Sequence, residues 1–365
     1  MNVKTRNAVI AIVLVAALVL SATAFVLYES MKGDNNTPAA ITDGIGRTVK
    51  LDQQPSKIIS TSDTTTAMIF ALGLGSRVIG VNGDGNYNVP DTVIGLTTTG
   101  DFPKVVREEL AKEKEGKSST IKSVGDTWGQ NVETLASMGP DLVVLDYNSY
   151  TYSGIKDRLS DFGIEYIVTG EEMDLDDILD NVKLLGQALG RSATAEKVID
   201  EMKEVMSSIN NKVKSATTEP KVAFLFMAAE PYYAIASGTF MHSQIELAGG
   251  QNAFGALSGW AETAKEGVLS VNPDIIIVDM DMGIGSSPDY GAMWASMQAD
   301  PIWSQINAVK NGDVYFLTGS ARAVTENASL RIVEGAALMA MILHPELYEE
   351  DLPQIIGDEY QEYLD

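Results

Sequence analysis

The feature that most constrains the fold is a fourteen-residue unit that occurs twice in the chain. The first copy is residues 133–146 (ETLASMGPDLVVLD) and the second is residues 266–279 (EGVLSVNPDIIIVD). Each copy has a Glu seven residues before Pro-Asp, followed by four aliphatic residues and an Asp. Aliphatic runs without alternation are typical of strands buried on both faces, as in a parallel sheet covered by helices. The two units therefore predict two similar α/β lobes rather than one barrel.

Other hydrophobic segments fit two Rossmann-like lobes with a helical connection. Short apolar runs predict further strands at residues 57–60, 77–81, 166–168, 221–227, 233–236 and 314–317. Between the lobes, two apolar stripes at helical spacing are separated or kinked by Gly190-Arg191-Ser192. We expect an N-terminal segment with a polar tether at residues 1–40 and an N-terminal α/β lobe at residues 41–173. A linker helix follows at residues 174–216, and a C-terminal α/β lobe at residues 217–365.

The N-terminal segment indicates where the protein is located. Residues 8–28 contain no charged side chain and follow Lys4 and Arg6. About 20 apolar helical residues span the hydrocarbon core of a bilayer, and the positive flank stays on the cytoplasmic side. The segment also fits a secretory signal peptide cleaved at residues 22–24 (ATA). Because the apolar run continues to Leu27, we favour an uncleaved transmembrane helix, and both interpretations place the main body outside the cytoplasm.

The composition excludes several kinds of partner and site. With 26 Lys and Arg against 50 Asp and Glu, the net charge is −24, which disfavours nucleic acid and anionic lipid as partners. The absence of Cys excludes disulfides, thiolate metal sites, thiol nucleophiles and a lipid-modified N-terminal cysteine. Only 2 His are present and they lie far apart in the sequence, so we expect no site for a bare metal ion.

A series of short segments resembles the substrate-binding proteins of ABC importers for iron complexes and cobalamin. These segments are the two repeated units together with residues 41–49 (ITDGIGRTV), 55–60 (PSKIIS), 69–81 (IFALGLGSRVIGV), 239–252 (TFMHSQIELAGGQN) and 343–346 (LHPE). The resemblance implies two α/β lobes joined by a long rigid helix, with the ligand in the cleft between them. It also implies an extracytoplasmic receptor that delivers its ligand to a permease dimer with cytoplasmic ATPase subunits.

Glu133 and Glu266 occupy equivalent positions in the two units, near the start of a predicted helix. A carboxylate at this position stabilises the helix dipole by about 0.3–1 kcal/mol, which is one explanation for its presence. In the family that the chain resembles, one glutamate per lobe meets arginines on the two permease subunits. We therefore expect Glu133 and Glu266 to dock the protein on its permease, since interface charges set orientation and association rate.

We expect the ligand site just beyond the strand ends, where open α/β sheets bind their ligands. The candidates are aromatic, Met and Arg side chains near those ends: Trp128, Tyr147, Tyr232, Tyr233, Trp260, Met280 and Arg322. Aromatic rings with flexible Met suit a large, partly apolar ligand. Arg322 can bind the carboxylate or catecholate oxygens of an anionic chelate. The alternatives are core packing for the aromatic and Met residues and a surface ion pair for Arg322.

The predicted function is a non-catalytic receptor without a resident cofactor. Its ligand is expected to be a ferric siderophore or similar iron complex, haem, or a corrinoid such as cobalamin. The alternatives are an extracytoplasmic enzyme or a cell-surface sensor on the same scaffold. The enzyme alternative lacks a Gly-x-Ser-x-Gly motif, a Cys and enough His for a convincing triad, although the 50 acidic residues leave carboxylate acid–base catalysis open.

Overall fold

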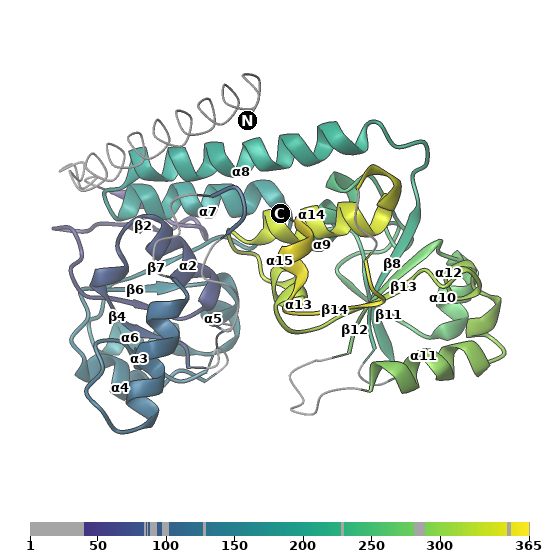
Figure 1. The fold of residues 1–365 in the computed structure, drawn as a ribbon. Coiled ribbons are helices and arrows are strands. Elements are labelled where there is room, and N and C mark those ends of the chain that lie inside the picture. Colours follow the sequence, from purple (N-terminus) through teal and green to yellow (C-terminus); the bar gives the residue numbers. More distant parts are fainter. Residues whose placement is uncertain are drawn as a thin grey trace, which may run out of the picture.

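The computed structural model describes residues 40–83, 85, 87, 93–96, 102–126, 129–227, 230–280, 289–348 and 352–364. They form two α/β lobes that lie side by side beneath the long helix α8 (Ser192–Val213) (Figure 1). The transmembrane helix predicted at residues 8–28 falls outside this description. Among the described residues, no helix has the length and apolar character needed to cross a membrane.

The N-terminal lobe is built on five parallel strands in the order β5-β4-β3-β6-β7. In chain order these strands are β3 (Ile58–Ser60), β4 (Val78–Val81), β5 (Lys122–Ser123), β6 (Leu142–Leu145) and β7 (Tyr166–Val168), preceded by a hairpin of β1 (Ile41–Thr42) and β2 (Thr48–Val49). Alternate residues of the central strands enter separate cores, Ile58 and Val144 on one face and Ile59 and Val143 on the other. The aliphatic run of the first repeated unit is therefore a doubly buried parallel strand, as predicted.

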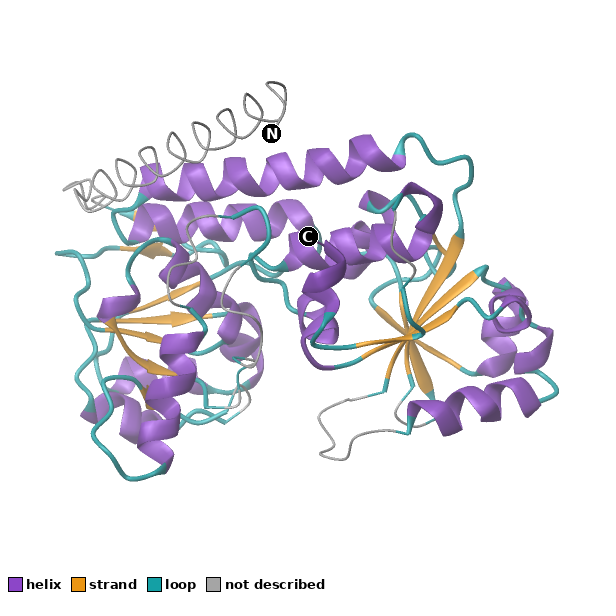
Figure 2. Cartoon of the chain, in the orientation of Figure 1, coloured by secondary structure: helices purple, strands orange, loops and turns teal. Residues whose placement is uncertain are grey.

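Helices cover both faces of this sheet (Figure 2). They are α2 (Asp63–Ala71), α3 (Lys104–Lys114), α4 (Val132–Ser137), α5 (Tyr147–Tyr152) and α6 (Ile155–Asp161). Met68 of α2 and Val106 of α3 pack in one core, whereas Leu135 of α4 and Leu159 of α6 pack in the other. This alternation of strand and helix around a parallel sheet confirms the predicted fold class.

The C-terminal lobe has a mixed sheet, in the order β11-β9-β8-β12-β13-β14 with β10 beside β8. The strands are β8 (Lys221–Phe226), β9 (Tyr232–Ile235), β10 (Gln251–Asn252), β11 (Trp260–Thr263), β12 (Ile275–Asp279), β13 (Val314–Leu317) and β14 (Ile355–Ile356). β8, β12, β13 and β14 are parallel, whereas β9 is antiparallel to both β8 and β11. The exception to the expected parallel sheet arises because a short connection between β8 and β9 allows only antiparallel pairing.

Two sets of helices enclose the C-terminal sheet (Figure 1). They are α9 (Phe240–Leu247), α10 (Lys265–Val271), α11 (Tyr290–Ala299), α12 (Asn307–Asn311), α13 (Gly319–Glu326), α14 (Ile332–Leu343) and α15 (Tyr360–Leu364). Phe224 and Ile277 face the core beneath α9, α13 and α14, and Leu225 and Ile276 face the core beneath α10, α11 and α12. The second repeated unit thus has the same doubly buried strand as the first.

The segment between the lobes is a helical hairpin of α7 (Leu175–Ala188) and α8. Gly190 in the turn has φ 65°, a left-handed conformation that favours glycine. α8 contributes Val198 and Met202 to the N-terminal core and Ile209 and Val213 to the C-terminal core. Because one continuous helix is packed in both cores, it holds the two lobes in a defined relation and restricts their relative motion.

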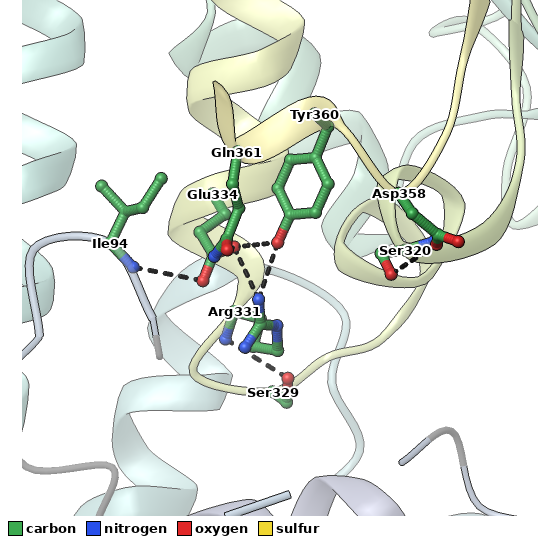
Figure 3. A network of polar contacts seen from close by, with 8 residues as sticks. All are labelled: Ile94, Ser320, Ser329, Arg331, Glu334, Asp358, Tyr360 and Gln361. Carbon is green, nitrogen blue, oxygen red and sulfur yellow. Dashed lines mark hydrogen bonds and ion pairs between the residues drawn. The ribbon is translucent and has the colours of Figure 1, made fainter. Parts of the chain in front are cut away.

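A buried polar network joins the C-terminal helix to the contact between the lobes (Figure 3). Glu334 of α14 accepts hydrogen bonds from Arg331 Nη2 at 2.8 Å and from the hydroxyl of Tyr360 in α15. Its second carboxylate oxygen accepts the backbone N–H of Ile94, from the N-terminal lobe, at 3.2 Å. Burial raises the pKa of Glu334. The last helix of the chain is therefore part of the structure that fixes the two lobes together.

Candidate functional site

A cavity of about 580 Å³ lies between the two lobes. Small-molecule sites commonly have volumes of about 300–1,000 Å³, so this cavity has room for an organic ligand or a metal complex. The N-terminal lobe lines it with residues 62–64, 146, 148 and 171–173, and the C-terminal lobe with residues 237–240, 258–260 and 326–328. The N-terminal segments follow β3, β6 and β7, so the cavity lies at the carboxyl ends of those strands, where open α/β sheets bind ligands.

Capping hydrogen bonds fix the N-terminal wall of the cavity. Ser62 caps α2 by accepting the backbone N–H of Thr65 at 3.2 Å. Asp146 caps α5 by accepting the backbone N–H of Ser149 at 3.3 Å, and its other carboxylate oxygen accepts the hydroxyl of Thr61 at 3.3 Å. Ser and Asp are preferred at helix N-termini because their side chains satisfy free backbone N–H groups. The polar groups on this wall are therefore held in place by local structure.

Glu172, also on the N-terminal wall, has a strongly altered acidity. Burial, together with the nearby charges of Asp146 and Asp177, raises the pKa of its carboxyl group to about 8. Asn181 of α7 donates a hydrogen bond to the Glu172 carboxyl at 2.9 Å. At neutral pH Glu172 is therefore largely protonated, and it gains its negative charge as the pH rises through about 8.

The C-terminal wall presents aromatic side chains. Trp260, at the start of β11, is 52% exposed, and its indole lies against Phe226 with ring centroids 4.6 Å apart. Phe240 is the first residue of α9, which Thr239 caps by accepting the backbone N–H of His242 at 3.2 Å. The two walls meet where Asn327 Nδ2 of the C-terminal lobe donates to Asp63 Oδ2 of α2 at 3.0 Å.

Arg322 of α13 lies behind this wall and is not among its lining residues. Its Nη1 donates to Glu326 Oε2 at 3.1 Å and lies 3.7 Å from Asp279 Oδ2. Asp279 is fully buried at the end of β12. The guanidinium predicted to meet an anionic ligand is therefore directed at two carboxylates of the protein itself, of which Glu326 lines the cavity.

Three other sequence candidates are not among the described residues that line the cavity. Tyr232 is buried with its ring 6.1 Å from that of Trp303, and Met280 packs against the same core of the C-terminal lobe. Tyr233 is 37% exposed and pairs across the sheet with Glu262 of β11. For Tyr232 and Met280 the structure thus shows the core packing that was the alternative interpretation.

The remaining aromatic candidates differ in their relation to the site. Trp260 lines the cavity. Tyr147 is partly buried between two residues that line it, Asp146 and Asn148. Trp128 lies outside the described residues. Of the seven predicted ligand residues, the described lining therefore includes Trp260 alone.

The residues predicted from the sequence did not include the acidic residues of the cavity or Phe240. Asp63 follows the end of β3 by three residues, and Glu171 follows the end of β7 by the same number. Their positions just beyond strand ends indicate both residues, because open α/β sheets bind ligands there, whereas the predicted ligand residues were mainly aromatic. The signal for Phe240 was the N-cap position of Thr239, which places the start of α9 at the cavity.

Comparison with known proteins agrees with this architecture. Residues 58–321, more than half of the chain, match the family described as periplasmic binding protein. The chain belongs to this family. The resemblance seen in the sequence is thereby confirmed, and so is the fold of two α/β lobes joined by a helix.

Three relatives illustrate the similarity. The binding protein is 26% identical to "Uncharacterized ABC transporter substrate-binding lipoprotein YvrC" of Bacillus subtilis, over 86% of this chain and 88% of that one. It is 24% identical to the vitamin B12-binding protein of Yersinia pestis, over 68% of this chain and 78% of that one. A possible iron-binding, periplasmic solute-binding protein of Staphylococcus epidermidis has a solved structure that superposes with a TM-score of 0.62 at 24% identity, covering 78% of this chain and 96% of that one. The description of the family as periplasmic and the naming of one relative as a lipoprotein agree with the extracytoplasmic location predicted for the main body.

The two glutamates of the repeated units belong to α4 and α10, helices that lie on different lobes of the binding protein (Figure 1). Glu133 is in the first turn of α4 and Glu266 in the first turn of α10, and both side chains are exposed. Glu133 also forms an ion pair with Arg158 of α6. Both positions are compatible with the structural role at a helix N-terminus and with contact to an external partner.

The Pro-Asp pairs of the two units have a structural role that is the same in both lobes. Asp141 Oδ2 accepts the backbone N–H of Ser56 at 2.8 Å and its hydroxyl at 2.6 Å, and these hydrogen bonds hold the pKa of Asp141 below its ordinary value. Asp274 Oδ2 accepts the backbone N–H of Lys221 at 3.0 Å. Each Asp thus joins its unit to the chain entering the neighbouring strand, β3 or β8, which explains why the motif repeats.

Proposed function

We propose that this binding protein captures a metal chelate outside the membrane and delivers it to the permease of an ABC importer. The chelate is a ferric siderophore or similar iron complex, haem, or cobalamin. The observation that carries the proposal is the cavity of about 580 Å³ with walls from both lobes. Relatives named for vitamin B12 and for iron support the ligand class. The relatives reported above are named as binding proteins, which supports a non-catalytic role.

Ligand binding is tested by tryptophan fluorescence on the full-length protein in detergent. Ferric hydroxamates, haem and cobalamins are titrated separately, with calorimetry to exclude optical artefacts. A ligand in the cavity quenches the exposed indole of Trp260 saturably, and Trp260→Phe removes most of that signal. Trp294→Phe is the control, because Trp294 packs against the core of the C-terminal lobe. No saturable response to any of these ligands would overturn the proposed function.

We further propose that Glu133 and Glu266 dock the protein on its permease, one glutamate on each half of the permease dimer. Both side chains are exposed and belong to different lobes. Two separated carboxylates suit a two-fold partner that carries basic side chains, because charges at the rim of an interface set its orientation. The transport experiment in the Discussion tests this assignment.

We also propose that residues 8–28 tether the protein to the membrane. One relative is named a lipoprotein, but this chain contains no Cys that a lipid could modify, so the apolar segment is the available anchor. The full-length protein is expected in the membrane fraction after carbonate washing, and a variant lacking residues 1–30 in the soluble fraction. If the gene for the full-length protein instead yields a soluble product whose N-terminus is near Phe25, a cleaved signal peptide is established.

A further inference from the structure

The charge of the cavity lining is of one sign. Five carboxyl groups line it, those of Asp63, Asp146, Glu171, Glu172 and Glu326. No Lys, Arg or His is among the described residues of the lining. The internal residues outside the description add no base either, because residues 84, 86, 88–92, 97–101, 127–128, 228–229, 281–288 and 349–351 contain no Lys, Arg or His. The negative character of the cleft is therefore a property of the sequence as well as of the geometry.

Protonation and nearby positive charge offset only part of the negative charge of these five carboxyl groups. Glu172 is largely protonated at neutral pH because its pKa is about 8, and Arg322 compensates Glu326 from 3.1 Å. Three carboxylates remain, all on the N-terminal wall. The N-termini of α2 and α9 each contribute about half an elementary charge of the opposite sign. The sum leaves the cavity negative, with the excess on one wall.

The opposite wall is suited to a different part of a ligand. Phe240 and the exposed indole of Trp260 line the C-terminal side. Aromatic faces bind apolar surface and also attract cations through the negative potential of the ring. A ligand that spans the cavity therefore meets carboxylates on one side and aromatic rings on the other.

The carboxylates do not form a site for a bare metal ion. Within the part of the chain that the structure describes, no three His, Asp or Glu side chains are grouped closely enough to hold one. The cavity of about 580 Å³ is also many times larger than an ion. The carboxylates thus act on the overall charge of a bulky ligand and not by coordinating its metal.

We propose that the cleft selects ligands with a net positive charge, namely metal complexes whose cationic part lies against the N-terminal wall and whose apolar surface lies against Trp260 and Phe240. This inference rests on the proposed function and adds the charge class of the ligand. An anionic chelate is disfavoured, because like charges repel strongly where water is partly excluded.

Two matched series of chelates test the charge preference. In the first, ferrioxamine B with its terminal ammonium is compared with its neutral N-acetyl and anionic N-succinyl derivatives, which keep the same iron centre. In the second, cationic aquacobalamin is compared with neutral cyanocobalamin at pH 7. Each is titrated into the full-length protein in detergent by calorimetry. In a series whose members bind, the dissociation constant of the cationic member is expected to be lower than that of the least positive member by a factor of about ten or more. This ratio is expected to decrease at high salt.

Variants locate the source of the preference. Asp146→Asn with Glu171→Gln removes two charges of the N-terminal wall, and Asn still caps α5. This variant is expected to narrow the charge preference to about threefold or less. Glu171→Gln alone, at an exposed position, gives an intermediate value and guards against misfolding of the double variant. The control is Asp176→Asn with Glu196→Gln, which removes two exposed carboxylates that do not line the cavity.

The possible outcomes separate the two proposals. Equal affinity within a series, tighter binding of the anionic or neutral member, or tightest binding of haem with its anionic propionates overturns the charge inference and leaves the receptor function standing. The charge inference is also overturned if the double variant of Asp146 and Glu171 keeps the same charge preference as the control variant. If the protein binds none of the hydroxamates, cobalamins or haem, the proposed function is overturned, and the charge inference with it.

Discussion

The two lobes share a folding unit but present different chemistry to the cavity between them. The carboxyl ends of β3, β6 and β7 supply four of the five carboxyl groups of the lining, whereas the C-terminal lobe supplies Trp260, Phe240 and one acid, Glu326. The difference begins at equivalent positions of the repeated unit. Asp146 lines the cavity, and its counterpart Asp279 is buried beside Arg322. The same unit is therefore used in one lobe to place charge in the site and in the other to support the wall from behind.

On their outer surfaces the two lobes are expected to have the same role, which is to dock on the permease through Glu133 and Glu266. Glu133→Ala combined with Glu266→Ala is expected to abolish ligand uptake by cells while the dissociation constant stays unchanged, because the glutamates are exposed and lie outside the cavity lining. The single variants show whether the lobes contribute equally. Glu196→Ala with Glu204→Ala on the exposed face of α8 is the matched control. Uptake at the wild-type rate by the double variant would leave the helix-dipole role as the explanation for both glutamates.

Arg322 distinguishes a supporting role from ligand contact. Arg322→Ala leaves the buried Asp279 without this cation, so the free energy of unfolding is expected to fall by about 3 kcal/mol. Urea denaturation measures this change. Affinity for a cationic chelate is expected not to fall, because the guanidinium does not line the cavity and its loss leaves the charge of Glu326 uncompensated. Unaltered stability together with a large loss of affinity for an anionic chelate would favour direct ligand contact instead.

The aromatic wall is tested by comparing two exposed aromatic residues of adjacent strands. Trp260→Ala is expected to weaken chelate binding by about tenfold or more, because it removes a ring that lines the cavity. Tyr233→Ala on β9 is the control, since Tyr233 is exposed on the same sheet but is not part of the lining. Calorimetry gives both constants. Equal losses in the two variants would mean that the ligand extends beyond the cavity described here.

The smallest expected effect concerns Glu172, whose ionisation makes stability and ligand affinity depend on pH. Between about pH 4.5 and pH 8 the folded protein retains a proton on Glu172 that the unfolded chain has released, so the free energy of unfolding falls as the pH rises through this window. Over the upper part of the window, ionisation of Glu172 adds negative charge to the cavity and tightens binding of a cationic chelate. Asp146 and Asp177 are the charged groups that raise its pKa.

Thermal unfolding and calorimetry at pH 6.5 and pH 8.5 measure both trends. Glu172→Gln is expected to reduce the pH dependence of both the stability and the affinity. The control is Glu196→Gln on the surface of α8, which is expected to leave both pH dependences unchanged. Profiles of Glu172→Gln that match those of the wild type would show that another group is responsible.

The sequence predicted the fold closely because the fold depends on local hydrophobic patterns. The runs at residues 142–145 and 275–278 are buried on both faces in the structure, as their lack of alternation indicated. The antiparallel placement of β9 was not predicted, since strand direction depends on the length of connections and on pairing, which hydrophobicity does not encode. The same limit applies to the C-terminal β14 and α15, whose place is set by contacts such as that of Tyr360 with Glu334.

The site was predicted less well because it forms only when distant segments meet. Trp260 was identified from its position before the repeated unit, but Tyr232 occupies a similar strand position and points into the core. Which face of a strand points inward at a sheet edge depends on register, and a shift by one residue reverses it. The charge of the cavity was missed for the opposite reason. In a chain with 50 acidic residues, no single Asp or Glu stands out until the lobes place five of them around one space.

We expect a metal chelate to bind between the carboxyl groups of the N-terminal wall and the aromatic rings of Trp260 and Phe240. The most direct measurement is anomalous diffraction at the iron or cobalt absorption edge from crystals grown with saturating cationic chelate. One strong metal peak is expected inside the cavity, between Asp146 and Trp260. A peak elsewhere on the protein, or an empty cavity at saturating ligand, would contradict it.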